Sequence, residues 1–200
     1  DRGLTWVVEE KVADGITPSL ALDGNGNPHV VFKDGAYLCY SHRVDGHWVA
    51  PDTIFDDWLS WNIYEPSLAI SPDSAYVVFV TIGTMPSRVM FGTFALDDPD
   101  PQLTPSIVNQ YAMAFRFRMP AIALQPTENG IDVHVAYNRY YDQGIGPCGY
   151  EVAYGCRSAD WIETPVSDYE DESPAENAAL TVAGDNIWIV WQQGTSPDIY

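Results

Sequence analysis

The amino-acid sequence predicts an all-β fold, a β-propeller of four-stranded antiparallel blades, with three complete blades and partial first and last blades. A similar segment recurs four times, and its anchor residues Leu20, Leu68, Ile122 and Leu180 stand 48, 54 and 58 residues apart. Within each repeat, short apolar runs rich in β-branched and aromatic residues alternate with turns of Gly, Pro, Asn and Asp. No window shows a 3.6-residue apolar period, so we expect almost no helix.

The first two strands of each blade come from the repeated segment itself. An apolar run, a polar turn and a second apolar run follow one another in residues 18–32, 66–79, 120–137 and 178–191. A third strand follows at 36–43, 87–95 and 149–157, and a fourth at 47–54, 101–108 and 160–167. Spacings of about 50 residues suit a propeller blade of four strands.

The two ends of the sequence also read as strands. Residues 5–12 resemble the fourth strand of a blade before the first repeat, and 196–200 resemble the start of a third strand. We therefore expect one propeller segment over 1–200, with blades at about 16–54, 64–108, 118–167 and 176–200, the last incomplete. A longer chain with more blades is the favoured interpretation, and closure of a four-bladed ring by strand 5–12 is the alternative.

The net charge of the chain limits the classes of molecule that it can bind. The chain has 28 acidic and 9 basic residues, a net charge of −19. Nucleic acid and anionic membrane surfaces need a basic footprint, so we exclude both as partners. No apolar run approaches the ~18 residues that a membrane span needs. The acidic, lysine-poor composition, rich in Trp and Tyr, is typical of an extracellular β protein, which predicts a secreted or cell-surface location.

Three cysteines allow at most one disulfide bridge. Cys39 stands alone, whereas Cys148 and Cys156 are eight residues apart. If 149–157 is extended, the bridge forms only when the loop before it folds back. Both states of this pair stay open.

Two motifs resemble those of sialidase-like propellers. Residues 41–48, SHRVDGHW, are similar to the Asp-box (BNR) turn, and Ser158, Asp160 and Trp161 keep part of it in the third blade. Residues 117–120, Phe-Arg-Met-Pro, are similar to the motif whose arginine grips the substrate carboxylate in sialidases, which would give Arg118 that role. The family also uses two more arginines, a Tyr with a Glu partner and an acid/base Asp, and none of these can be assigned here.

One end of the propeller is the candidate binding face. Loops from the fourth strand to the next blade, and from the second strand to the third, share that end, and they carry aromatic and charged residues suited to a sugar or an extended peptide. The candidate ligand residues are Trp58, Trp61, Tyr64, Glu65, Arg116, Arg118, Arg139 and Tyr140. The alternative is structural: Trp61 and Tyr64 fill gaps between blades, and Arg116 and Arg118 pair with local acids such as Glu65.

Metal binding has one weak candidate. Asp23, Asn25 and Asn27 have the alternating oxygen spacing of a calcium loop but lack a later bidentate Glu, so we expect a turn there and no cofactor other than calcium at most. His29 and His134 occupy the same repeat position, which predicts a structural role for each.

The leading functional hypothesis is a non-catalytic extracellular propeller module that binds a glycan or an extracellular protein and packs against the remaining blades of its own chain. A sialidase-type glycoside hydrolase is one alternative, and a structural component of an extracellular assembly is another. Fold alone does not choose among them.

Overall fold

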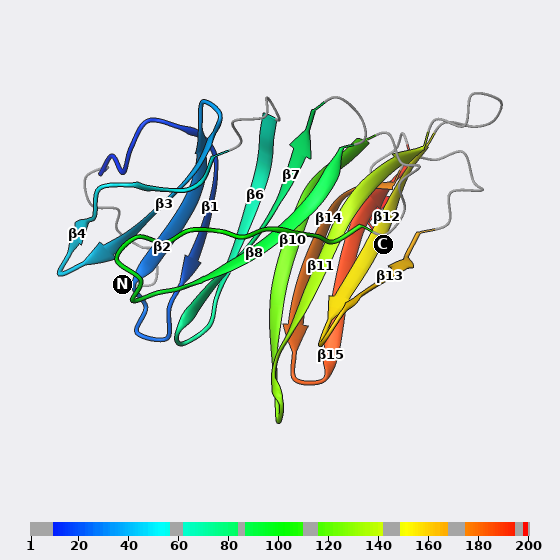
Figure 1. The fold of residues 1–200 in the computed structure, drawn as a ribbon. Coiled ribbons are helices and arrows are strands. Elements are labelled where there is room, and N and C mark those ends of the chain that lie inside the picture. The colour runs from blue at the N-terminus through cyan, green and yellow to red at the C-terminus, as the bar shows by residue number, and fades with distance from the viewer. Residues whose placement is uncertain are drawn as a thin grey trace.

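The computed structural model describes residues 10–56, 62–83, 87–109, 116–141, 149–167, 175–194 and 198–199. Every regular element in this part of the chain is a β-strand, and the strands form four antiparallel blades in chain order (Figure 1). The predicted all-β propeller fold is confirmed. Within the described ranges there is no helix with the length and apolar character to span a membrane.

The strands of each blade follow one another in sequence. Blade 1 contains β1 (Ile16–Leu22), β2 (Pro28–Asp34), β3 (Tyr37–Val44), β4 (His47–Trp48) and β5 (Asp52–Asp56). Blade 2 contains β6 (Asn62–Ile70), β7 (Ser74–Ile82), β8 (Arg88–Ala95) and β9 (Ser106–Ile107). Blade 3 contains β10 (Arg116–Thr127), β11 (Gly130–Tyr141), β12 (Gly149–Arg157) and β13 (Trp161–Pro165). Blade 4 contains β14 (Ala175–Ala183), β15 (Asn186–Gln193) and β16 (Asp198–Ile199).

The sequence ends are only partly described. Of the predicted strand 5–12, residues 10–12 are described and are not in a strand. Of 196–200, residues 198–199 form β16, which pairs with β15 as a third strand would. Hairpins between the first two strands of every blade lie at one end of the molecule, the lower end in Figure 1.

Apolar side chains hold neighbouring blades together along three contact surfaces, which we call seams. In β7, the second strand of blade 2, side chains alternate between two seams: Val77 and Phe79 pack toward blade 1, whereas Val78 and Val80 pack toward blade 3. This use of both faces explains why the strand reads as a continuous apolar run in the sequence. Each fully buried side chain of this size contributes roughly 1.5–3 kcal/mol to folding.

The outer faces of blades 1 and 4 expose the positions that the seams bury. Leu68 and Ile122 in blades 2 and 3 are 6% and 9% exposed, whereas the equivalent Leu20 of blade 1 is 61% exposed. On the other side, Val78 is 0% exposed, whereas the equivalent Val190 of blade 4 is 46% exposed. Both outer faces therefore carry seam residues without a seam in the described structure.

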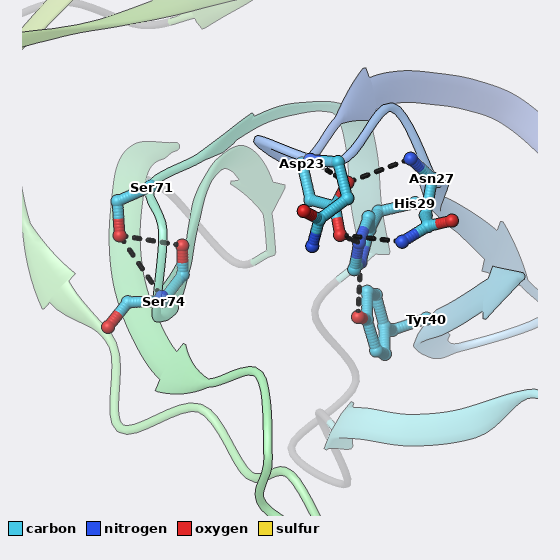
Figure 2. Close-up of polar contacts among 7 residues, drawn as sticks. Asp23, Asn27, His29, Tyr40, Ser71 and Ser74 are labelled. Atoms are coloured by element: carbon cyan, nitrogen blue, oxygen red, sulfur yellow. Dashed lines mark hydrogen bonds and ion pairs between the residues drawn. The ribbon is translucent and has the colours of Figure 1, made fainter. Parts of the chain in front are cut away.

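Polar side chains close the hairpins between the first and second strands. In blade 1, the Asp23 carboxylate accepts hydrogen bonds from the backbone N–H groups of Asn25 (2.9 Å) and Asn27 (2.7 Å), and from the Asn27 amide (2.9 Å) (Figure 2). In blade 2, the Ser71 hydroxyl accepts a bond from the Ser74 N–H at 3.0 Å. The hydrogen bonds from Asn27 and Asn25 lower the pKa of the Asp23 carboxyl group. They make residues 23–27 a turn that is stabilised by a side chain, as the sequence predicts.

Blade 1 and blade 3 each contain a histidine hydrogen-bonded to a tyrosine, at equivalent positions. The Tyr40 hydroxyl lies 2.6 Å from Nδ1 of His29, and the Tyr154 hydroxyl lies 2.6 Å from Nδ1 of His134 (the first pair is drawn in Figure 2). Burial lowers the pKa of both histidines and raises the pKa of both tyrosines. In blade 3, Nε2 of His134 lies 3.1 Å from the amide oxygen of Gln125, which can only accept, so Nε2 carries the proton and Nδ1 accepts from Tyr154. The structural role predicted for His29 and His134 matches this geometry.

Candidate ligand site at the propeller channel

A β-bulge interrupts the innermost strand of every blade at the same point. The ladder register shifts between Ile16 and Ser19, Tyr64 and Ser67, Arg118 and Ala121, and Glu176 and Ala179. Within each shift one residue has a positive φ: Thr17 (50°), Glu65 (50°), Met119 (49°) and Asn177 (58°). Residues other than glycine rarely adopt this backbone conformation, and such strained positions concentrate at functional sites.

These bulges surround a hollow at the channel between the blades. It has a volume of about 320 Å³ and is lined by residues of all four innermost strands. The lining residues are Thr17, Pro18, Ser19, Glu65, Pro66, Ser67, Met119, Pro120 and Ala178. A smaller hollow of about 150 Å³ shares Met119 and is also lined by Arg118, Asn138 and Glu176. Together we call them the channel site.

Glu65 links blades 2 and 3 at this site. Its Oε2 accepts a hydrogen bond of 2.6 Å from the backbone N–H of Met119, and its Oε1 lies 3.7 Å from Nη1 of Arg118. The Arg118 side chain is 49% exposed, and an ion pair so open to water is worth only about 0–1 kcal/mol. Arg118 can therefore exchange part of this contact for a ligand oxygen at small cost. The pairing with Glu65 is the one that the sequence suggested.

Asn138 brings an unsatisfied acceptor to the site. The residue is 2% exposed, and its amide nitrogen donates a 2.7 Å hydrogen bond to the carbonyl of Ala175 in blade 4. Its buried Oδ1 has no hydrogen-bond partner among the described residues. A buried acceptor without a donor costs about 1–3 kcal/mol, which a ligand hydroxyl would recover.

Asn138 and Glu176 were not among the predicted site residues. A signal was present: Asn138 occupies the same ladder position as Lys33 in blade 1 and Gln192 in blade 4, whereas blade 2 has Val80 there. A polar residue therefore recurs in three of the four blades at one position of the second strand, and this recurrence is the signal that the sequence offered.

Among the predicted candidates, Trp58 and Trp61 lie outside the described residues. Tyr64 is half-buried against the seam between blades 2 and 3, and Nζ of Lys33 lies 4.3 Å from its ring centroid. This contact joins blades 1 and 2, as the gap-filling alternative proposed. Arg116 is exposed at the start of β10 and pairs across the ladder with Tyr140.

Arg139 belongs to a buried ion cluster inside blade 3. Its Nε donates to Glu151 at 2.9 Å and its Nη1 donates to Glu163 at 2.8 Å. The side chains are 6%, 5% and 0% exposed, in the order Arg139, Glu151 and Glu163. The structure therefore places Arg139 in the sheet, where two carboxylates occupy its guanidinium. Sequence spacing could not predict that Arg139 in β11 would reach Glu163 in β13.

No metal centre is formed by the described residues. In those ranges, no three His, Cys, Asp or Glu side chains are arranged so that they could hold a metal ion. The weak calcium candidate Asp23 uses both carboxylate oxygens within its own turn. Cys39 and Cys156 are free thiols, and Cys148 lies outside the described residues.

Comparison with known proteins identifies the fold. No protein-family model matches the sequence, and no curated protein matches it. Among solved structures, a mutant α-L-arabinanase of Cellvibrio cellulosa is 14% identical with a TM-score of 0.54, over 94% of this chain and 67% of that chain. An endo-arabinase of Bacteroides thetaiotaomicron is 10% identical with a TM-score of 0.57, over 92% of this chain and 72% of that one. Both are β-propellers, and at these identities the likeness shows the fold alone.

Proposed function

We propose that this chain is a non-catalytic, extracellular β-propeller module that binds a glycan at the channel site. The observation that carries the proposal is the hollow where Arg118, Asn138 and Glu176 meet beside Met119, with a buried Oδ1 of Asn138 that has no donor among the described residues. An unsatisfied buried acceptor next to an exposed guanidinium favours a ligand that both donates and accepts hydrogen bonds.

Sugars have this chemistry, because each hydroxyl can donate one bond and accept others. Asn138 Oδ1 and the Glu176 carboxylate accept from hydroxyls, the Arg118 guanidinium donates to a ring or hydroxyl oxygen, and Met119 offers an apolar contact. The channel hollow of about 320 Å³ lies at the lower end of ligand-site volumes, which suits one or two sugar units.

Two further considerations support a glycan outside the cell. Two solved structures of similar fold are named as an α-L-arabinanase and an endo-arabinase, so a propeller of this kind can serve a saccharide-handling protein. The composition, with only two lysines and a net charge of −19, is typical of extracellular β proteins.

Glycan binding is tested with a glycan array that includes arabinan oligosaccharides and sialosides, followed by titration calorimetry on the best ligand. Arg118→Ala should weaken binding by about tenfold or more, because a charge-assisted hydrogen bond is worth roughly 1.5–3 kcal/mol. Arg88→Ala is the matched control, since Arg88 lines neither hollow of the channel site. Equal affinity in both variants would contradict the proposed site.

A sialidase-type hydrolase is the second candidate. The observation that favours it is the position of Arg118, the arginine of the Phe-Arg-Met-Pro segment, which lies half-exposed at the channel site, 3.7 Å from the Glu65 carboxylate. Fluorogenic sialosides and dye-linked arabinan report hydrolysis directly. Turnover that disappears in Arg118→Ala and Glu65→Gln would replace the binding proposal with an enzyme, and silence of array and assays alike would favour an architectural role.

A further inference from the structure

A second polar hollow lies in the seam between blades 2 and 3, at the hairpin end of the propeller. Its volume is about 270 Å³, and it shares no lining residue with the channel site. The lining residues come from the starts of β7 and β11, from the middle of β8, from the end of β12 and from the turn after it: Ser74, Tyr76, Ile131, Val133, Phe91, Thr93, Arg157, Ser158 and Ala159. These strand ends are at the lower end of the molecule in Figure 1.

Arg157 gives this hollow its charge. Its guanidinium carbon lies 5.3 Å from the centroid of the Phe91 ring, which holds the planar group against the wall of blade 2. No acidic residue lines the hollow, and no ion pair joins Arg157 to another described residue. Thr93 and Ser158, which carry hydroxyl groups, are also among the lining residues, so the hollow combines one cation with hydrogen-bonding side chains.

The same repeat position in blade 1 already holds a carboxylate. Arg43 stands three residues after Tyr40, as Arg157 stands three after Tyr154, and both tyrosines bond to the repeat histidines. Nη2 of Arg43 lies 3.1 Å from Oε2 of Glu10. An arginine at this position of the third strand can therefore bind a carboxylate. In blade 3 no described residue supplies one, so the carboxylate would belong to a ligand.

We propose that the seam hollow of blades 2 and 3 is a second ligand site, which binds the carboxylate of an acidic sugar through Arg157. A planar guanidinium takes a carboxylate by two parallel hydrogen bonds, Thr93 and Ser158 reach the adjoining hydroxyls, and the half-buried Tyr76 lines the wall beside the sugar ring. A net charge of −19 repels polyanions such as acidic peptides and nucleic acids, whereas a single carboxylate meets this repulsion least. The site is independent of the channel proposal.

The test is an NMR titration of the 200-residue chain with glucuronate at low ionic strength, with glucose as the neutral control. We expect saturable shifts of the backbone amides of Thr93, Arg157 and Ser158, and none with glucose. Arg157→Gln should weaken glucuronate binding at least tenfold. Arg157→Lys should keep part of the affinity, because an ammonium retains the charge and loses the two-pronged geometry.

Two control variants separate this site from others. Arg88→Gln removes a charge outside the hollow, and Arg118→Ala disables the channel site; both should leave glucuronate binding at Arg157 unchanged. The proposal is overturned if glucuronate does not bind, or if Arg157→Gln folds, by circular dichroism, and binds as the parent does. If that variant fails to fold, Arg157→Lys with unchanged affinity overturns it too. N-acetylglutamate binding as tightly as glucuronate would overturn the sugar in favour of a peptide carboxylate.

Discussion

The buried ion cluster of blade 3 gives the sharpest prediction. Replacing Arg139 by Met removes the guanidinium that pairs with Glu151 and Glu163, whose side chains are 5% and 0% exposed. Breaking a buried ion pair in this way costs about 3–5 kcal/mol, because the remaining charges stay desolvated. With domain stabilities of roughly 5–15 kcal/mol, the loss would be a large share of the total.

Urea denaturation followed by tryptophan fluorescence measures this loss. If the slope is about 2 kcal/mol per molar urea, the midpoint should fall by about 2 M in Arg139→Met. The triple variant Arg139→Met, Glu151→Gln, Glu163→Gln should recover most of the stability, because neutral amides cost less to bury than unpaired carboxylates.

The opposite result would refute the reasoning. If Arg139→Met unfolds at the parent's urea concentration but loses glycan affinity, then Arg139 acts on the ligand, as predicted from the sequence, and the cluster contributes little to the fold. If both properties change, the triple variant separates them, because it restores the fold without the guanidinium.

The remaining predictions concern the seams and the histidines. Val78→Ala should lower the free energy of unfolding by about 2–3 kcal/mol, because it opens a cavity in a closed seam, whereas Val190→Ala on the open face of blade 4 should change it by less than about 0.5 kcal/mol; equal losses in calorimetric unfolding would contradict the seam assignment. Burial lowers the pKa of His29 and His134 below the ordinary 6.5, so their contribution to stability is fully present above pH 6.5 and is lost as the pH falls below it. The double variant His29→Gln, His134→Gln should flatten the stability profile between pH 5 and 7, and an unchanged slope would assign it to other groups.

The blade architecture could be predicted from sequence because it repeats. The Leu20, Leu68, Ile122 and Leu180 anchors fall in the four innermost strands, and the turn at Asp23 follows from local hydrogen bonding within five residues. Both are short-range patterns, set by strand alternation and turn chemistry. For the same reason the shared position of His29 and His134 indicated a common structural role.

The contents of the site were harder to predict because they depend on contacts between blades. Glu65 reaches Met119 across 54 residues of sequence, and Asn138 reaches Ala175 across 37. Arg139 and Asn138 are neighbours in sequence, but alternation sends them to opposite faces of the sheet, one into a closed ion cluster and the other into the channel. Sequence spacing alone could not tell which of these two residues faces the channel.

The repeated bulge has a consequence for engineering. Its backbone shape occurs with four different side chains, Thr17, Glu65, Met119 and Asn177, so the ladder shift sets the conformation and glycine is not required. Side-chain identity is therefore uncoupled from backbone geometry at four places around one opening. A library randomised at Thr17, Met119 and Asn177, with Glu65 kept for its bond to blade 3, would vary the chemistry of the opening on the same backbone.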